Sequence, residues 1–485
     1  MIQPGIKIIG LGPGEAFLIT RQAWQILENA TEIYLRTNQH PAVKGLPGHL
    51  RVNSFDHLYE TSENFESVYN GIIEKILELG HRPEGVVYAV PGHPFMAEAT
   101  VPGIIERASK EGLPVEVVEG LSFLEPTFTA LGIDPLPQIT LIDALELGGS
   151  HFPSFPPDTP AIIVQIHSRA IASEVKLTLM EVYPDEHAVQ LIHGAGTTDQ
   201  LVETLPLYEI DRSPQVGLLT SLYVPPLGIG TSLEVFQDVI AALRAPDGCP
   251  WDREQTHLSL RPHLLEEVYE VLTALDRQDT PALCEELGDL LLQIALHAQI
   301  ASEEGEFKMV DILQGIHHKI VRRHPHVFGD LKLTNSESVI QNWERLKATE
   351  KKSNGNTQSG LLEGVSITMP ALSQAQTYQV RAARVGFDWP EIQGVYDKFA
   401  EEIKELQAAG DNLTQEQEIG DLLFALVNLA RWLKVDAESA LRESNARFRG
   451  RFAHIEKVAK EQDRQLSDLS LEEMEHHWQS AKGLE

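Results

Sequence analysis

Cysteine is almost absent from this sequence of 485 residues. Cys249 and Cys284 are too few for a disulfide framework, so we expect a reducing compartment, the cytoplasm. No apolar run approaches the roughly 20 residues that a membrane span needs, and we therefore expect no membrane partner. The first residues, MIQPGIKIIGLGPGE, contain no basic segment and no cleavage site, so they do not resemble a signal peptide.

Basic residues are also scarce, because 39 Lys and Arg stand against 71 Asp and Glu, a net charge of −32. A chain this acidic repels polyanions, so we expect no nucleic-acid partner. A small anion such as a triphosphate is different, since a bound divalent cation can bring it into an acidic site. Acidity also serves solubility, and alone it does not indicate a metal.

The order of predicted elements divides the chain into an α/β part and an all-α part. Residues 1–227 alternate short apolar runs with amphipathic patterns of helical spacing, which is typical of an α/β domain. The predicted strands include KIIGLG, VVYAV, VEVVEG, AIIVQI and AVQLIHG. From residue 230 onward, long amphipathic patterns dominate and strand signals nearly vanish, so this half is predicted to be helical.

The helical half contains an internal repeat. The segment EEVYE at 266–270 returns as EEIKE at 401–405, and three later polar motifs follow in the same order. Apolar helices resemble one another easily, but four ordered polar motifs do not. We therefore predict two all-α repeats, at 230–352 and 363–485, joined by a linker at 353–362.

Each repeat carries carboxylates at helical spacing. In the pattern EExxE the acids share one helix face, with Cβ atoms roughly 5–6 Å apart, and ExxD repeats this spacing on the next predicted helix. If the two helices pack antiparallel, the acids converge and repel one another unless a cation is bound. Oxygen ligands with positions left for water and phosphate suit Mg²⁺. The predicted metal ligands are Glu266, Glu267, Glu270, Glu286 and Asp289, and Glu401, Glu402, Glu405, Glu418 and Asp421.

A simpler interpretation of these acids must be weighed. A single ExxE on an amphipathic helix is usually a solvated face. Asp289 is harder to explain in this way, because it precedes the apolar run LLLQIALHA and lies at the rim of a buried surface. Two complete sets in the same order favour a metal site.

The surrounding sequence resembles a known family. The pattern EExxE, spacer, ExxD, together with CPWDREQTH, RRHPHVFGD, NWERLKA and RAARVGFDWP, resembles the MazG family of all-α nucleoside triphosphate pyrophosphatases. The resemblance covers roughly residues 230–485. It implies a Mg²⁺-dependent homodimer that hydrolyses NTPs and dNTPs between the α and β phosphates, giving monophosphate and pyrophosphate, as a housecleaning enzyme of the nucleotide pool.

The residues are chemically compatible with that reaction. Metal ions on the carboxylates would neutralise phosphate oxygens and lower the pKa of an attacking water, and by position Glu267 and Glu402 could accept its proton. Paired cations and Trp–Lys pairs suit a polyphosphate and a base. The predicted substrate-binding residues are Lys319, Arg323, Trp343, Lys347, Arg447, Arg451, Trp478 and Lys482. Taken singly, these cations could instead complement helix dipoles, and the tryptophans could be packing residues.

Glycine-rich segments mark the N-terminal half. GLGPGEAFLIT follows the first predicted strand, and its glycines allow a ligand to approach the backbone closely. AVPGHPFMAEATV, EGLSFLE and GAGTTDQ follow later strands, and Ser122 with Glu125 predicts a capping box. Together these segments resemble the S-adenosylmethionine-dependent tetrapyrrole (corrin/porphyrin) methylases, and the fusion resembles two-domain proteins of the YabN type.

The methylase resemblance implies two α/β lobes with S-adenosylmethionine in the cleft between them. The residues that would line this cofactor site are Gly12, Pro13, Gly92, His93, Pro94 and Ser122. The chain departs from the family where it has PGEA after Gly12 in place of PGDP, and GHP at 92–94 in place of GDP. These departures bear more on the methyl acceptor than on cofactor binding.

Three functional hypotheses follow. The leading one is a nucleoside triphosphate pyrophosphohydrolase with an appended methylase-like domain whose acceptor is unknown. The alternative is an S-adenosylmethionine-dependent methyltransferase whose helical half is regulatory or oligomerising. A third makes both halves non-enzymatic modules, but it requires damaged carboxylate sets, and both sets are complete.

Overall fold

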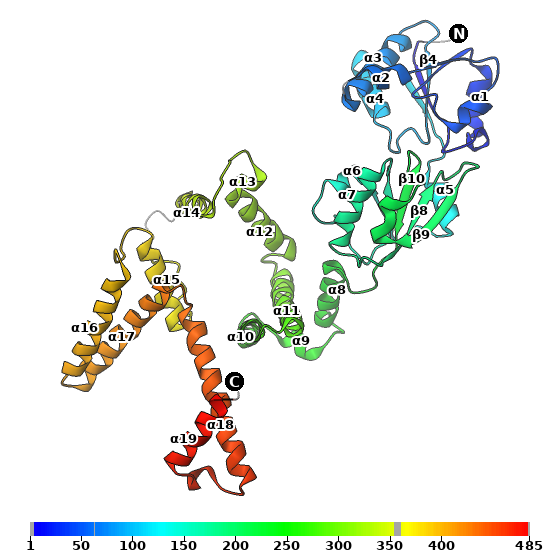
Figure 1. Ribbon diagram of the computed structural model, residues 1–485. Coiled ribbons are helices and arrows are strands. Elements are labelled where there is room, and N and C mark those ends of the chain that lie inside the picture. Colours follow the sequence, from blue (N-terminus) through cyan, green and yellow to red (C-terminus); the bar gives the residue numbers. More distant parts are fainter. Residues whose placement is uncertain (1–3, 63, 354–359, 484–485) are drawn as a thin grey trace. The chain divides into compact units, whose positions relative to one another are not determined.

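The computed structural model describes residues 4–62, 64–353 and 360–483. The chain divides into two compact units, Met1–Ala242 and Leu243–Glu485 (Figure 1). The first unit contains two five-stranded sheets, while the described part of the second contains helices and no strand. The predicted fold class, α/β followed by all-α, is confirmed.

The first sheet is parallel and has the strand order β3-β2-β4-β1-β5. Its strands are β1 (Ile6–Gly10), β2 (Glu32–Leu35), β3 (Arg51–Ser54), β4 (Val86–Val90) and β5 (Val115–Val118). Neighbouring residues of β1 face opposite sides, so Ile8 packs in the apolar cluster with Ile72 and Ile104 while Ile9 packs in the cluster with Leu27. Central strands covered on both faces form nearly continuous apolar runs, which makes β1 and β4 readable in the sequence.

Helices surround this sheet and connect its strands. They are α1 (Arg21–Asn29), α2 (Asp56–Thr61), α3 (Phe65–Gly80) and α4 (Thr100–Glu111). Short 3₁₀ helices occur at Ala16–Leu18 and Pro41–Gly45. Because every strand is parallel, the loops after β1, β4 and β5 emerge at one edge of the sheet, where ligands of such folds bind.

The second sheet is mixed and has the strand order β6-β7-β10-β8-β9. Its strands are β6 (Thr140–Asp143), β7 (Ala161–Val164), β8 (Ala188–His193), β9 (Leu201–Pro206) and β10 (Thr220–Val224). The accompanying helices are α5 (Leu124–Leu131), α6 (Ala144–Gly148), α7 (Arg169–Met180) and a 3₁₀ helix, Leu207–Arg212. Ile163, Leu191 and Leu222 of the central strands pack with Val175 of α7 in one buried core.

Helix α8 (Leu233–Arg244) spans the boundary between the two units. The helices that follow are α9 (Pro250–Glu254), α10 (Arg261–Arg277), α11 (Thr280–Glu304), α12 (Met309–Arg323), α13 (Pro325–Phe328), α14 (Ser336–Ser353), α15 (Ala371–Ala383), α16 (Ile392–Ala408), α17 (Asn412–Trp432), α18 (Ala437–Glu461) and α19 (Leu471–Lys482). A 3₁₀ helix, Leu466–Asp468, precedes the last of them. The pairs α10–α11 and α16–α17 each form a helical hairpin.

The two hairpins share their local design. Asp279 caps α11 by accepting a hydrogen bond from the Ala282 N–H, and Asp411 caps α17 by accepting one from the Thr414 N–H. A side-chain cap at this position satisfies a backbone donor that the first helical turn leaves free. The repeated cap extends the internal repeat beyond the motifs seen in the sequence.

The predicted linker at 353–362 falls partly within the described residues. Residues 354–359 lie outside them. Helix α14 continues to Ser353, the first residue of the predicted linker.

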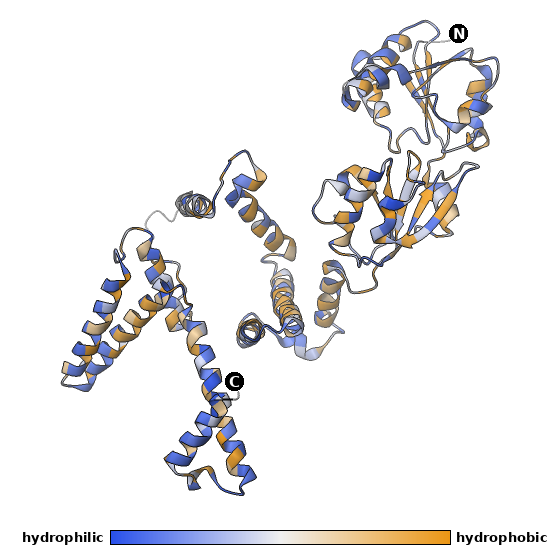
Figure 2. Cartoon of the chain, viewed as in Figure 1, coloured by the Kyte–Doolittle hydropathy of each residue, from blue (hydrophilic) through white to orange (hydrophobic). Residues whose placement is uncertain are grey.

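Several helices of the second unit carry exposed apolar stripes at helical spacing, and Figure 2 shows apolar residues recurring along α11. The exposed stripe of α11 is Leu287, Leu291 and Ile294, and that of α17 is Ile419, Leu423 and Leu426. The stripe of α12 is Val310, Leu313, Ile316 and Ile320, whose exposed fractions run from 43% to 61%. Such a stripe normally faces a core or a partner helix.

Candidate functional site

The hairpin of α10 and α11 brings the first carboxylate set together. Glu267 and Glu270 come from α10 and Glu286 from the first turns of α11. Each offers one carboxylate oxygen, and these three oxygens lie within 4.8 Å of one another. Three predicted metal ligands from two successive helices therefore converge.

The carboxylates of this first set repel one another. Burial raises the pKa of Glu267, and repulsion from Asp289 and Glu270 raises it further. Burial and then repulsion from Glu270 likewise raise the pKa of Glu286. Asp289 thus acts on the set electrostatically, while Glu266 lies 3.7 Å from the Nδ1 of His263.

The second carboxylate set has the same arrangement on α16 and α17. One oxygen each of Glu402, Glu405 and Glu418 lies within 4.8 Å of the others, and Glu402 is buried. Burial raises the pKa of Glu405 against the lowering effect of Lys398, and repulsion from Glu402, Glu401 and Glu418 adds to the increase. Asp421 follows Glu418 by one turn on the same helix.

Lys398 belongs to the second set and was not predicted from the sequence. Its Nζ lies 2.8 Å from Glu402 and 3.1 Å from Glu401, and hydrogen bonds to these two acids raise the lysine pKa. Its spacing of three and four residues before these acids was a readable signal. The corresponding residue of the first repeat is His263, so the two sets differ in the side chain beside them.

The donor groups of both sets fit a hard divalent cation. They are carboxylate oxygens, which Mg²⁺ prefers. Burial and repulsion from neighbouring acids raise the pKa of Glu267, Glu286 and Glu405 among them. A bound divalent ion would relieve this repulsion.

The predicted cations of the first repeat gather elsewhere, on α12 and α14. Two of them lie close to the ring of Trp343, with the Arg323 guanidinium 5.2 Å and the Lys347 Nζ 4.9 Å from its centre. Arg323 also donates a hydrogen bond of 2.6 Å to Glu350. Lys319 lies one turn before Arg323 on α12. The structure therefore brings Arg323, Trp343 and Lys347 together, on helices other than those of the carboxylates.

The second repeat gathers its aromatic and cationic residues on α18 and α19. The Arg451 guanidinium lies 5.4 Å from the centre of the Trp478 ring, and Trp478 also packs against Phe448 at 5.2 Å. Trp478 thus has a packing role in a small apolar cluster. Arg447 lies 3.6 Å from Glu443, and Lys482 is the last residue of α19.

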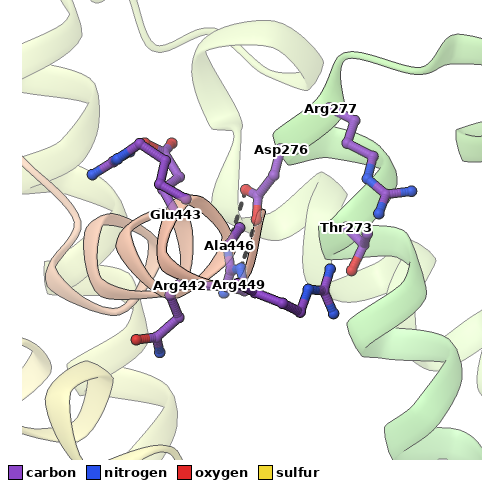
Figure 3. A pocket seen from close by; sticks show the side chains of 9 residues that line it. Thr273, Asp276, Arg277, Arg442, Glu443, Ala446 and Arg449 are labelled. Carbon is purple, nitrogen blue, oxygen red and sulfur yellow. Dashed lines mark hydrogen bonds and ion pairs between the residues drawn. The ribbon is translucent and has the colours of Figure 1, made fainter. Parts of the chain in front are cut away.

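A cavity of about 480 Å³ lies between α10 and α18 (Figure 3). Asp276 accepts two hydrogen bonds from Arg442, of 2.6 and 3.2 Å, at its wall. The lining residues are Thr273, Asp276, Arg277, Arg442, Glu443, Asn445, Ala446, Arg447 and Arg449. Arg447 is the one predicted substrate-binding residue among them, and the predicted metal ligands are not part of this wall.

In the first unit, glycines bring three loops into contact at the edge of the first sheet. Gly12 and Gly92 exchange backbone hydrogen bonds of 2.8 and 3.3 Å, and both have a positive φ, 74° and 65°. A Cβ atom on Gly10 would lie 2.4 Å from the Gly92 carbonyl oxygen and 2.8 Å from the Cα of Gly120. Only glycine allows the loops after β1, β4 and β5 to approach this closely.

The same edge meets the second lobe. A Cβ atom on Gly14 would lie 1.9 Å from the carbonyl oxygen of Gly196, which belongs to the loop after β8. Pro13 lies between Gly12 and Gly14 in the loop that makes this contact. Loops of both lobes therefore border the place where the cofactor was predicted.

The remaining predicted cofactor residues lie in the loops after β4 and β5. His93 and Pro94 follow Gly92, and the His93 Nδ1 accepts a hydrogen bond of 3.1 Å from the Phe95 N–H. Ser122 is buried, but the predicted capping box is wrong. Helix α5 begins at Leu124 with Phe123 as its N-cap. The Ser122 hydroxyl donates to the Glu125 carboxylate at 2.7 Å and accepts a hydrogen bond of 3.0 Å from the Leu124 N–H, which is not the reciprocal backbone pairing of a capping box.

His40 supports the glycine loop and carried no signal in the sequence. It is buried, and burial lowers its pKa to about 4, against the effect of a hydrogen bond to the Gly12 backbone. A neutral imidazole therefore holds the loop at physiological pH. A lone histidine before a proline does not reveal such a contact.

A buried ion pair adjoins the same edge. Arg36 follows β2 and lies 2.5 Å from Glu98, whose other oxygen accepts hydrogen bonds from the Thr100 N–H and hydroxyl. Tyr59 accepts a hydrogen bond from the Arg36 Nε. The pair fixes the segment between β4 and α4, because a buried charge without its partner is costly.

Within the residues that the structure describes, no helix is both long and apolar enough to cross a bilayer.

Comparison with known proteins identifies both parts. The model of the MazG nucleotide pyrophosphohydrolase domain matches residues 255–328, and that of the tetrapyrrole (corrin/porphyrin) methylases matches residues 5–211. The chain is 44% identical over 254 residues to the nucleoside triphosphate pyrophosphohydrolase/pyrophosphatase MazG of Thermotoga maritima, covering 52% of this chain and 97% of that protein. It is also 44% identical over 250 residues to the nucleoside triphosphate pyrophosphohydrolase of Escherichia coli (strain K12), covering 50% of this chain and 94% of that protein.

One relative extends over both parts. The uncharacterized protein YabN of Bacillus subtilis (strain 168) is 43% identical over 489 residues, covering 99% of each chain. The matches confirm both family resemblances of the sequence. The chain therefore belongs to the YabN-type family, in which a tetrapyrrole methylase domain precedes a MazG nucleotide pyrophosphohydrolase domain.

Proposed function

We propose that this protein is a Mg²⁺-dependent nucleoside triphosphate pyrophosphohydrolase that cleaves NTPs and dNTPs between the α and β phosphates. The products are the monophosphate and pyrophosphate, and the role is to clear unwanted nucleotides from the pool. The observation that carries the proposal is the carboxylate set on paired helices, which occurs twice. Within each set, three carboxylate oxygens lie within 4.8 Å of one another. The names of the Thermotoga and Escherichia relatives, each matched over more than nine-tenths of its length, support it.

The metal would be held by the carboxylates of each hairpin. We assign Glu266, Glu267, Glu270, Glu286 and Asp289 to the first site, and Glu401, Glu402, Glu405, Glu418 and Asp421 to the second. Mg²⁺ bound there would supply charge neutralisation for the phosphates and acidify a water molecule. Glu267 and Glu402 are our candidates for the base because they occupy the same position in the two repeats. The raised pKa of Glu267 suits that residue to accepting a proton.

The substrate's polyphosphate and base would contact the cation and tryptophan groups. In the first repeat Arg323 and Lys347 flank Trp343 and present positive charge beside an aromatic face. These groups lie on α12 and α14, whereas the carboxylates lie on α10 and α11. A triphosphate needs both groups at once, so we propose that a second copy of the chain completes each site.

The exposed apolar stripes support a homodimer. Leu313 and Ile316 of α12 are each 47% exposed, and α11 and α17 carry matching stripes. Covering such residues removes apolar surface from water at about 25 cal/mol per Å². A second copy is a suitable partner because the same stripes recur on both repeats and a two-fold interface joins like surfaces.

We also propose a cytoplasmic location without nucleic-acid or membrane partners. The two cysteines form no disulfide, and nucleoside triphosphates are intracellular substrates. The net charge of −32 opposes binding to polyanions.

Replacing Glu267 by Gln tests the metal assignment. The pKa of Glu267 is raised in the folded state above its ordinary value of 4.5. The charged carboxylate therefore destabilises the metal-free folded protein when the pH is above 4.5. We expect Glu267→Gln to raise the melting temperature of the helical unit at pH 7 in EDTA, and the gain to vanish below pH 4.5, where Glu is protonated in both states. With Mg²⁺ the sign should reverse, since a ligand is lost.

The matched control is Glu456→Gln, which removes an exposed carboxylate on α18 outside both sets. Calorimetric scans of the full chain should show no Mg²⁺-dependent shift for this control relative to the unaltered protein. A stabilisation by Mg²⁺ that Glu267→Gln leaves unchanged would remove this residue from the metal site.

The double variant Glu267→Ala/Glu402→Ala tests the reaction. Loss of a base and metal ligand in both repeats should lower monophosphate formation by at least roughly 100-fold. Each single variant then reports how much its repeat contributes. The measurement is chromatography of the nucleotide products with His318→Gln as the control, and unchanged turnover in the double variant would refute the site assignment.

The dimer is tested by adding charge to the α12 stripe. Leu313→Glu/Ile316→Glu should convert the full chain from dimer to monomer in analytical ultracentrifugation, because two charges in an apolar interface are costly. Ile229→Glu is the control, since Ile229 is 96% exposed in a segment outside the stripes. A chain that sediments as a monomer before any substitution would contradict the proposal.

Methyl transfer is the second candidate function, with the helical half regulatory or oligomerising. It is favoured by the three glycine loops at Gly10, Gly92 and Gly120, whose close approach forms a backbone-lined edge between the lobes. We propose S-adenosylmethionine as the ligand there, bound by Gly12, Pro13, Gly92, His93, Pro94 and Ser122.

Calorimetry with S-adenosylmethionine tests this ligand. The full chain should bind it, and Gly92→Val should abolish binding, because valine at a φ of 65° is strained and projects into the edge. Gly48→Ala is the control, since a Cβ atom there meets nothing within 4 Å. No heat of binding at millimolar ligand would show that the fold has lost this function.

A further inference from the structure

A third group of ligating side chains lies at the C-terminal end of α11, apart from both carboxylate sets. We propose that His257, Glu304 and Glu306 form a site for a first-row transition metal ion such as Zn²⁺. One ligand atom of each lies within 4.8 Å of the others. In a tetrahedral Zn²⁺ site the donors are roughly 3.4 Å apart, and both carboxylates are exposed and free to make the small adjustment.

The ring of His257 is held in place by a second histidine. The Nδ1 atoms of His257 and His297 lie 2.7 Å apart, and the two rings stack with centroids 5.0 Å apart and planes 7° from parallel. This contact occupies the Nδ1 of His257, so we assign its Nε2 as the ligand atom. Histidines that bind metals characteristically hold their other ring nitrogen in such a hydrogen bond.

The local charge calls for a cation. Glu303, Glu304 and Glu306 cluster at the negative end of the helix dipole, where carboxylates are unfavourable. Arg244 neutralises the first of them through a 2.8 Å ion pair. Glu304 and Glu306 make no ion pair with any described residue.

The backbone brings the ligands together from two segments. Gly305 ends α11 in the left-handed conformation, with φ of 72°, and the turn places Glu306 beside Glu304. His257 comes from the loop before α10, and the guanidinium of Arg244 ties this loop down by donating to the backbone carbonyls of Asp252 and Gln255. A metal here would fasten the loop to the turn between α11 and α12.

The ligand chemistry separates this site from the two carboxylate sets. Those sets offer oxygen alone, which suits Mg²⁺. One imidazole with two carboxylates suits a borderline ion such as Zn²⁺, which Mg²⁺ does not displace readily from nitrogen.

Zinc binding to the full chain tests the site. Titration calorimetry with Zn²⁺ in excess Mg²⁺ should give one more bound Zn²⁺ per chain for the unaltered protein than for His257→Gln. Glu304→Gln/Glu306→Gln, which alters only exposed side chains, should lose the same equivalent. His318→Gln removes a histidine of α12 outside the cluster and should keep it.

The site is independent of nucleotide hydrolysis, and the variants distinguish the two. Glu267→Gln/Glu402→Gln should keep this Zn²⁺ equivalent whatever it does to turnover. Equal Zn²⁺ stoichiometry in His257→Gln, in the double carboxylate variant and in the unaltered protein would overturn the proposal. Displacement of this Zn²⁺ by excess Mg²⁺ in the unaltered protein would overturn the proposal as well.

Discussion

Repulsion between carboxylates on paired helices is the constraint around which the helical unit is organised. The hairpins α10–α11 and α16–α17 each hold three acids, with one oxygen of each acid within 4.8 Å of the others. Burial and repulsion from the neighbouring acids raise the pKa of Glu267 in the first set and of Glu405 in the second. Helix packing and the aspartate caps at Asp279 and Asp411 fix this geometry. A divalent cation bound there would relieve this repulsion, and under our proposal the free energy of folding would then depend on the metal.

The two sets are copies with different neighbours. Lys398 reaches Glu401 and Glu402 in the second set, while His263 stands near Glu266 in the first. The second set therefore has a lysine ammonium beside its acids where the first has an imidazole. This difference gives a physical basis for unequal metal affinity in the two repeats. The cations and tryptophans assigned to the substrate lie on other helices than the carboxylates. We therefore propose that a second copy of the chain, bound through the exposed apolar stripes, completes each site.

The sequence predicted features that are local or repeated. The apolar strands β1 and β4, the amphipathic helices and the acids at helical spacing all follow from periodicity along the chain. The strand β3 was missed because its four residues, RVNS, are mostly polar. The strand β2, EIYL, was missed although it is no more polar than the predicted strand β5. His40 and the Arg36–Glu98 pair were missed because their partners are distant in sequence. Lys398 was within reach, since it precedes Glu402 by one helical turn.

In both units of the chain, the candidate site is built from groups that come from separate segments of the sequence. In the α/β unit glycines bring loops together, and in the helical unit acids converge on a cation that we place between two helices. Anomalous diffraction from crystals of the full chain grown with Mn²⁺ and a slowly cleaved triphosphate analogue tests this placement most directly. The account predicts Mn²⁺ peaks at the carboxylates of α10–α11 and of α16–α17, in contact with the phosphates. Peaks confined to other places, with both carboxylate sets empty, would contradict it.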